Sequence, residues 1–180
     1  MSTTRIQHPQ EWYLLPIFGI KDGICECHRD CTSPGKHPQT RHGLKDATNN
    51  PDTIIRWTER TNSLAVRTGP ESGLVVIDTD LSTGGLVTWQ EVTSQHEPIE
   101  TVTAITGGGG RHYYFQHPGV KVRNRVSILE GIDVRGDNGY VLLPGSSHLQ
   151  GTYEWEDGKS PDDLPIAPLP EWLSTLLLKD

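Results

Sequence analysis

The stretch Gly73-Leu-Val-Val-Ile-Asp-Thr-Asp80 decides the fold, because it joins a buried strand to two acidic side chains. Its four consecutive branched apolar residues are bounded by glycine and by acids, which predicts a strand that runs into the core. Side chains alternate along a strand, so Asp78 and Asp80 would point to the same face. Two carboxylates aimed at one spot suit a hard divalent cation. The structural alternative is that these aspartates only open a turn.

Length and composition indicate a globular protein outside the membrane. A chain of 180 residues is large enough for one domain with its own core, which we expect at 1–160. A proline-rich linker and a C-terminal helix would follow at 161–180. No apolar stretch approaches the ~18 residues of a membrane span, and the start lacks the apolar core of a signal peptide. The sequence therefore predicts a cytoplasmic protein with no membrane partner.

The net charge of −7 argues against wholesale electrostatic wrapping of nucleic acid. The charge is unevenly distributed, because acids crowd near the C-terminus and bases gather in the middle of the chain. The basic stretch comprises Lys121, Arg123, Arg125 and Arg135. A local positive surface is therefore compatible with the acidic total.

The three cysteines lie within seven residues, a pattern that favours a metal site over disulfides. Cys25, Cys27, Cys31 and His37 form a Cys3His set in a loop rich in turn residues, which is an acceptable ligand set for structural zinc. His28 competes with His37 for the fourth position. The alternative is three reduced thiols in a surface loop, although free cysteines are usually buried.

The remaining elements are expected to be short. Apolar alternation and turn residues predict strands at 14–18, 63–69, 101–106, 113–115, 132–134, 140–143 and 151–155. Helices are expected after a cap at Thr48 or Asn50, at 86–94 and at 171–178. The turn at 136–139 would join its two flanking strands into a hairpin.

Two further segments carry side chains that suit phosphate chemistry. The glycine run at 107–110 is either a flexible turn or a backbone that can approach a phosphate closely, and it leads directly into Arg111 and His112. Asp133 lies in the middle of an apolar strand, where a buried acid needs a cation or solvent. Asp78, Asp80, His112 and Asp133 thus form one candidate constellation.

The chain carries three motifs in order: Asp-x-Asp, a motif that ends in His, and an apolar residue followed by Asp. With these motifs the sequence resembles the bifunctional primase-polymerase (prim-pol) domain of the archaeo-eukaryotic primase superfamily. The likeness extends over roughly residues 34–155. It includes Lys36-His37-Pro38, Lys45-Asp-Ala-Thr48, Ile54 to Trp57, Val66-Arg-Thr-Gly69, Ile132-Asp-Val-Arg135, Gly139-Tyr140 and Pro144 to Ser147. The joint match is far more specific than any one of these motifs.

The resemblance implies an α+β fold with an RRM-like mixed or antiparallel sheet, helices packed on it and the small zinc loop at 25–37. Residues 1–160 would be the catalytic domain, which performs template-directed synthesis from nucleoside triphosphates on single-stranded DNA or a primer-template. Asp78, Asp80 and Asp133 would hold two Mg2+ or Mn2+ ions, and His112 would contact the nucleotide phosphates. The weaker candidates for phosphate binding are Arg67, Arg111, Arg135, Ser146, Ser147 and His148.

The same resemblance implies a replicative protein of a phage, plasmid or mobile element. In many relatives a helicase follows this domain, whereas this chain ends at Asp180, so we expect an excised domain or a short stand-alone protein. Two other functions remain open at this point. One is a metal-dependent nuclease, since three carboxylates also suit phosphodiester hydrolysis. The other is a catalytically silent, zinc-stabilised nucleic-acid-binding module.

Overall fold

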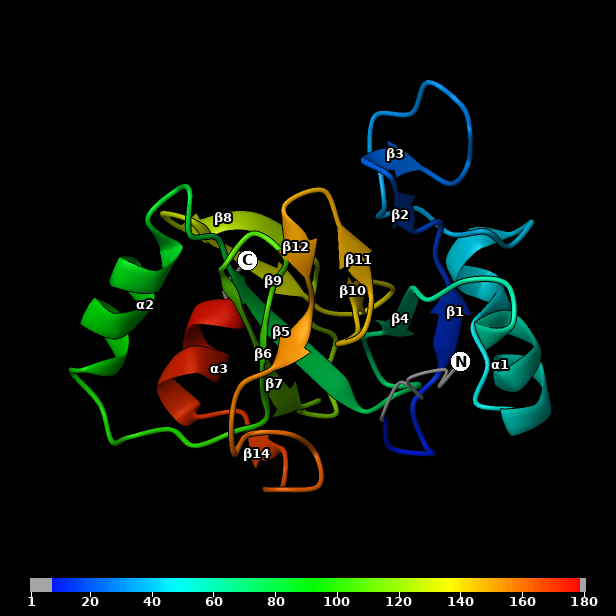
Figure 1. The fold of residues 1–180 in the computed structure, drawn as a ribbon. Coiled ribbons are helices and arrows are strands. Elements are labelled where there is room, and N and C mark those ends of the chain that lie inside the picture. Colours follow the sequence, from blue (N-terminus) through cyan, green and yellow to red (C-terminus); the bar gives the residue numbers. More distant parts are fainter. Residues whose placement is uncertain (1–7, 179–180) are drawn as a thin grey trace.

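The computed structural model describes residues 8–178, which form a mixed α+β fold with mostly antiparallel sheets (Figure 1). The main sheet has seven strands in the order β13-β6-β7-β5-β9-β8, with β14 beside β7. Its strands are β5 (Leu74–Thr79), β6 (Thr103–Ile105), β7 (Arg111–Gln116), β8 (Arg125–Leu129), β9 (Ile132–Arg135), β13 (Glu154–Trp155) and β14 (Ala167–Pro168). The predicted α+β class is therefore confirmed.

A second sheet of three strands packs on one face of the main sheet. It has the order β1-β4-β10, and comprises β1 (Leu14–Pro16), β4 (Leu64–Arg67) and β10 (Tyr140–Leu142). Two hairpins complete the strands, formed by β2 (Ile20–Lys21) with β3 (Ile24–Cys25) and by β11 (Ser147–His148) with β12 (Gly151–Thr152).

Strand β5 lies at the centre because its side chains serve two cores. Leu74 and Val76 pack into a cluster with the second sheet, whereas Val75 and Ile77 pack into a cluster on the opposite face. All four side chains are essentially fully buried. An uninterrupted apolar run is what a strand covered on both faces requires, and its alternation assigns Asp78 to the face of Leu74 and Val76.

Three α-helices are present in the described part of the chain. Helix α1 (Pro51–Thr58) is capped by the Asn50 side chain, which accepts a hydrogen bond from the Thr53 amide, and it packs on β1. Helices α2 (Gly85–Thr93) and α3 (Glu171–Leu177) lie together on the other side of the main sheet (Figure 1). A short 3-10 helix, η1, spans Gly43–Asp46. The predicted helices are thus present within one or two residues of their expected ends.

The prediction that the turn at 136–139 joins its flanking strands into a hairpin is wrong. Strand β10 pairs with β4 in the second sheet, whereas β9 pairs with β5 and β8 in the main sheet. The turn passes the chain from the main sheet to the second sheet, and two hydrogen bonds hold it in place: Thr68 Oγ1 donates to the Gly136 carbonyl, and the Gly136 amide donates to Asn124 Oδ1. The single strand expected at 151–155 is also divided, into β12 and β13.

The segment predicted to be an extended linker contacts the main sheet. Strand β14 pairs in parallel with β7, and the Ala167 amide donates a hydrogen bond to Thr101 Oγ1. Leu173 and Leu177 of α3 are buried in the same cluster as Val75 and Ile77. Within residues 8–178, no helix is both long enough and apolar enough to cross a membrane.

Candidate active site

The centre of the candidate site is a row of three side chains across neighbouring strands. In the sheet register, Asp78 of β5 lies directly opposite His112 of β7 on one side and Asp133 of β9 on the other. Residues opposite each other in an antiparallel pair place their side chains on one face, about 4.5–5.5 Å apart at Cβ. The sheet thus brings together three of the four side chains that the sequence pattern grouped, namely Asp78, His112 and Asp133.

The carboxylates of this row are held by a cation from the protein itself. One Nη atom of Arg135 lies 3.0 Å from Asp133 Oδ2 and 3.4 Å from Asp78 Oδ2. The second oxygen of Asp133 accepts a hydrogen bond from the Ser127 amide at 2.9 Å. Arg135 follows Asp133 by two residues on β9, so both side chains project to the same face. The guanidinium therefore offsets the repulsion between two half-buried carboxylates.

His112 completes the row on the other side of Asp78. Its Nε2 atom lies 3.4 Å from Asp78 Oδ1, and its side chain is only 5 % exposed. Burial raises the pKa of Asp78, but the charges and hydrogen bonds of His112 and Arg135 outweigh it, so the pKa of Asp78 is lowered. Within the described residues, the buried Nδ1 of His112 has no hydrogen-bond partner. An unpaired buried donor or acceptor is costly, which is a feature typical of functional sites.

Asp80 lies just beyond the end of β5 and is exposed. Its Oδ1 atom accepts hydrogen bonds from the amide and hydroxyl of Ser82, at 2.7 and 2.6 Å. The Asp80 amide donates to Gly131, and the Asp80 carbonyl accepts from Gly85, so the backbone here is fixed on both sides. Asp80 therefore opens a turn, as the structural alternative expected, and still faces the same cavity as Asp78.

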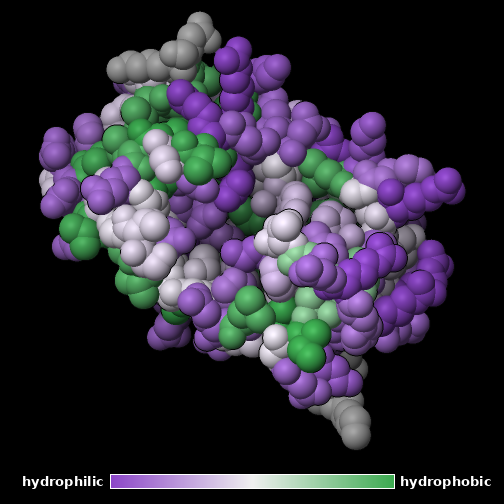
Figure 2. Space-filling model, turned by 90° about the horizontal axis from the view of Figure 1, so that it is seen from above, coloured by the Kyte–Doolittle hydropathy of each residue, from purple (hydrophilic) through white to green (hydrophobic). Residues whose placement is uncertain are grey.

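A cavity of about 200 Å3 lies over this end of β5. Asp78, Asp80, His112 and His148 line it, and Asp133 lies next to it through its pairing with Asp78. The further lining residues are Lys36, Thr79, Leu81, Ser82, Thr106, Gly108, Gly110, Gln150 and Tyr153. Figure 2 shows that the molecule seen from above carries mostly hydrophilic residues, with hydrophobic ones in separate patches. A cavity of this kind suits a polar, charged ligand.

The other predicted phosphate-binding residues are engaged elsewhere. Arg111 lies on the opposite face of β7 from His112 by strand alternation, and its Nε is 3.5 Å from Glu156. Arg67 pairs with Glu71 and donates a hydrogen bond to Asn138. The Ser146 hydroxyl donates to the Leu64 carbonyl, while the Ser147 hydroxyl accepts from the Ile20 amide. None of these four side chains is among the residues that line the cavity.

Sequence reasoning did not assign Lys36, Gln150 and Tyr153, which also line the cavity. Lys36 directly precedes the predicted ligand His37, and a cation beside a metal loop was a usable signal. Gln150 and Tyr153 follow His148 around the β11–β12 hairpin, and nothing local in the sequence distinguishes them from ordinary hairpin residues.

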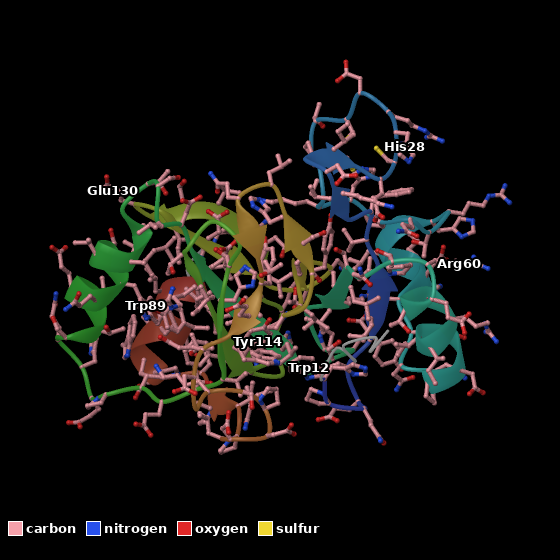
Figure 3. All side chains as sticks on the ribbon, in the orientation of Figure 1. Trp12, His28, Arg60, Trp89, Tyr114 and Glu130 are labelled. Atoms are coloured by element: carbon pink, nitrogen blue, oxygen red, sulfur yellow. The ribbon has the colours of Figure 1, made fainter. Side chains whose placement is uncertain are left out.

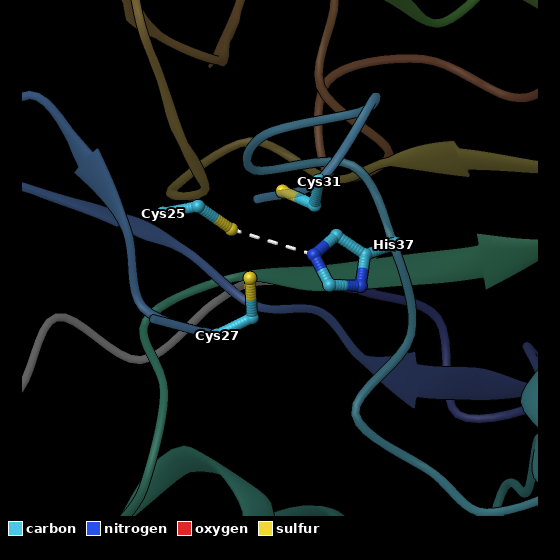
Figure 4. Close-up of side chains that lie close together, drawn as sticks. All are labelled: Cys25, Cys27, Cys31 and His37. Carbon is cyan, nitrogen blue, oxygen red and sulfur yellow. Dashed lines mark hydrogen bonds between the residues drawn. The ribbon is translucent and has the colours of Figure 1, made fainter. Parts of the chain in front are cut away.

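The predicted zinc ligands are brought together by the β2–β3 hairpin and the loop after it. The ligand atoms of Cys25, Cys27, Cys31 and His37 all lie within 4.8 Å of one another (Figure 4). His28 lies on the same loop outside this group, so the structure favours His37 as the fourth ligand (Figure 3). No other group of three or more His, Cys or acidic side chains with this closeness occurs among residues 8–178. The carboxylates of Asp78, Asp80 and Asp133 are thus farther apart than the ligand atoms of the Cys3His group, and they would have to move closer together to bind one cation.

The chemistry of the Cys3His group fits zinc. Cys25 Sγ lies 3.4 Å from His37 Nε2, close to the ~3.5 Å between sulfur and nitrogen ligands of one tetrahedral zinc ion. Burial raises the pKa of Cys25, but hydrogen bonds from the amides of Cys27 and Gly35 and from His37 lower it to about 6. Burial and the neighbouring cysteines raise the pKa of Cys31 to about 11. The thiolate of Cys25 is therefore favoured before metal binds, whereas a cation would be needed to favour the thiolate of Cys31.

The chain matches the family model described as Prim-Pol, bifunctional DNA primase/polymerase, N-terminal, over residues 7–172. The chain belongs to the Prim-Pol family. This match covers nearly the whole sequence, including β14 and the start of α3. The comparison with curated proteins gives no match.

Family membership indicates nucleotidyl transfer of the primase and polymerase kind, with nucleotides and DNA as ligands. Prim-Pol enzymes generally use divalent metals, and the donors found here agree with that chemistry. Carboxylate oxygens at Asp78, Asp80 and Asp133 are the ligands that Mg2+ and Mn2+ prefer, and Arg135 marks the place between two of them where a cation is favourable.

Proposed function

We propose that this Prim-Pol domain extends or starts DNA chains by template-directed nucleotidyl transfer with a two-metal mechanism. The observation that carries the proposal is the row Asp133–Asp78–His112 across β9, β5 and β7, beside a polar cavity. This row offers acceptors for cations and a buried histidine for phosphate on one face of one sheet. The proposal includes a core of the RRM-like archaeo-eukaryotic primase type.

The protein's own side chains would have three tasks. Asp78, Asp80 and Asp133 would hold two Mg2+ or Mn2+ ions, which supply charge neutralisation and a lowered pKa for the attacking 3'-hydroxyl. His112 would donate a hydrogen bond to a phosphate oxygen of the nucleoside triphosphate. Arg135 would exchange its contacts with Asp78 and Asp133 for contacts with phosphate, since a guanidinium suits bidentate phosphate binding.

Two parts of the proposal rest on other grounds. The zinc role of the Cys3His loop is structural, because its ligands are local in sequence and lie outside the carboxylate row. The setting, replication of a phage, plasmid or mobile element on single-stranded DNA or a primer-template, rests on the family resemblance alone. A helicase partner belongs to the same expectation.

The test is nucleotide incorporation on primed and unprimed DNA templates with Mg2+ or Mn2+. We expect Asp78→Ala and Asp133→Ala each to lower the rate by at least about a thousandfold, because each removes a ligand that acts only with the others. Glu130→Gln is the matched control, since Glu130 is an exposed acid in the turn between β8 and β9 (Figure 3). Its rate should equal that of the wild type.

The same assay separates the alternatives. Shortening of the template strand, lost in both alanine variants, would identify a nuclease. Tight DNA binding with no product under either metal would indicate the binding module. Incorporation that survives both substitutions would contradict the assignment of the row as the catalytic centre.

A further inference from the structure

Among residues 8–178, Lys36 contributes the only lysine or arginine side chain to the lining of the cavity. It is exposed, and among residues 8–178 no carboxylate lies within salt-bridge distance of its ammonium group. Burial, and after it the positive charge of Lys36, lowers the pKa of His148 across the same cavity. The cavity thus holds Asp78, which Arg135 already contacts, together with Asp80 and one cation, Lys36, that no carboxylate of the described residues neutralises.

The backbone of Lys36 is fixed by the metal loop. The residues on both sides of Lys36 contact the same sulfur. The Gly35 amide donates to Cys25 Sγ at 3.5 Å. His37 Nε2 lies 3.4 Å from the same Sγ atom (Figure 4). The Lys36 carbonyl accepts a hydrogen bond from Tyr140 Oη at 2.8 Å. Lys36 therefore lies between His37, a predicted zinc ligand, and Gly35, whose amide contacts the predicted ligand Cys25.

The metal loop is in turn attached to the rim of the cavity. The Ile20 amide of β2 donates to Ser147 Oγ at 2.8 Å, and Ile20 pairs with Cys25 in the β2–β3 hairpin. Ser147 is followed by His148, which lines the cavity. No side chain of residues 20–37 belongs to one of the apolar core clusters, so we expect the shape of the loop to depend on what holds its ligands together. Metal binding to a site of local ligands supplies such a tie.

We propose that Lys36 binds the distal phosphates of the incoming nucleoside triphosphate, and that metal in the Cys25, Cys27, Cys31 and His37 site positions Lys36 to do so. The proposal rests on the proposed function, because it adds a residue to the same nucleotide site. Two divalent cations held by Asp78, Asp80 and Asp133 would have much of their charge offset by these three carboxylates, so part of the triphosphate charge would remain uncompensated. A lysine is a compact charge on a flexible stem, which suits terminal phosphate oxygens. The metal loop thereby belongs to the nucleotide site.

The first experiment measures equilibrium binding of an α,β-imido deoxynucleoside triphosphate in Mg2+, where no transfer occurs. We expect Lys36→Ala to weaken binding by roughly ten- to a hundredfold, the usual range for a charged hydrogen bond. Lys36→Arg should restore most of the affinity. Binding of the deoxynucleoside monophosphate should be the same in all three proteins, since it lacks the distal phosphates. Lys21→Ala is the matched control, an exposed lysine of β2 that does not line the cavity.

The second experiment tests the positioning by metal. Cys31→Ser, with loss of zinc verified by metal analysis, should weaken triphosphate binding as much as Lys36→Ala does. The double variant should bind no more weakly than either single variant, because both changes remove one interaction. If Cys31→Ser lowers the folded fraction, wild-type protein stripped of zinc by a chelator and then reloaded replaces it. Stripping should weaken binding, and zinc should restore it with Mg2+ constant throughout.

The outcomes separate this proposal from the proposed function. A wild-type protein that binds no nucleoside triphosphate would overturn the proposed function itself. Wild-type protein that binds and incorporates nucleotides, with Lys36→Ala binding equally well, would overturn only the role of Lys36. Zinc-stripped protein with unchanged triphosphate affinity, or a double variant with multiplied losses, would overturn the positioning by metal.

Discussion

Asp78 is the residue on which the two sides of the candidate site depend. It contacts His112 on β7 and Arg135 on β9, and it is the only member of the row that pairs with both neighbours. The sequence predicted this acid from a local pattern, because a strand followed by Asp-x-Asp is readable without tertiary information. The ion pair between Asp78 and Arg135 could not be predicted from the sequence, since it depends on which strand pairs with β5.

The electrostatics of Asp78 give a pH prediction for the metal-free protein. Its pKa in the folded state is lowered from an ordinary value of 3.8, since His112 and Arg135 outweigh burial, which raises it. The folded carboxyl thus holds a proton less tightly than the unfolded one. This carboxylate therefore stabilises the fold above the ordinary pKa, and the contribution is lost as pH falls through the lowered pKa.

We expect the free energy of unfolding of Asp78→Asn to fall less steeply than that of the wild type between about pH 5 and pH 2. Urea unfolding without divalent metal measures it. Asp157→Asn, at an exposed aspartate, should keep the wild-type slope. Equal slopes for Asp78→Asn and the wild type would contradict the contacts described for Asp78.

The elements around the site pack through backbone as much as through side chains. Helix α2 begins at Gly85, whose amide donates to the Asp80 carbonyl, and the carbonyl of Gly131, directly before β9, accepts from the Asp80 amide. Gly131 has a φ of 67°, which favours glycine, and a Cβ built on Gly85 would lie 2.0 Å from the Gly131 carbonyl oxygen. The first turn of α2 therefore fixes the position of Asp80.

Gly85→Ala should lower the free energy of unfolding by about 1–3 kcal/mol, the usual cost of overpacking, and should also slow nucleotide incorporation. Chemical denaturation and the incorporation assay measure the two effects. Val87→Ala on the same helix, at a side chain that is 61 % exposed, should change stability by less than about 0.5 kcal/mol. A fully active Gly85→Ala protein would show that Asp80 does not need this packing.

Element types were more predictable than element partners. The helix at α1 was predicted from Asn50 and Pro51, and its cap is present, because capping is a local property. The partner of β10 was not predicted, because the turn at 136–139 has the composition of a hairpin turn. In the structure Val141 of β10 is buried with Val66 of β4, in the core cluster between the two sheets. Burial across sheets overrode local turn chemistry there.

The whole molecule has a main sheet between two apolar layers. One layer joins it to the second sheet, with Trp12 stacked on Tyr114 at 5.6 Å between ring centroids (Figure 3). The other layer joins it to α2 and α3. The sequence predicted a linker before α3, because prolines disfavour regular structure, but a short parallel pairing needs only two residues in register.

The C-terminal helix should therefore contribute to the stability of the whole fold. Leu173→Ala, at a side chain that is 1 % exposed, should cost about 2–5 kcal/mol in the free energy of unfolding. Leu178→Ala, directly after α3 and 43 % exposed, is the matched control and should cost less than about 0.5 kcal/mol. Thermal or urea unfolding measures both. Equal small effects would mean that α3 packs without stabilising the sheet.

The central claim is that Asp78 and Asp133 act as one unit on the reacting nucleotide. The most direct test is the rate of single-nucleotide incorporation by Asp78→Asn, Asp133→Asn and the double variant, with folding verified for each protein. Because we propose that both acids hold the same ions, each single variant should lose at least about a thousandfold, and the double variant should lose no more than the worse single one. Losses that multiply in the double variant, or near-normal incorporation by Asp133→Asn, would contradict the claim.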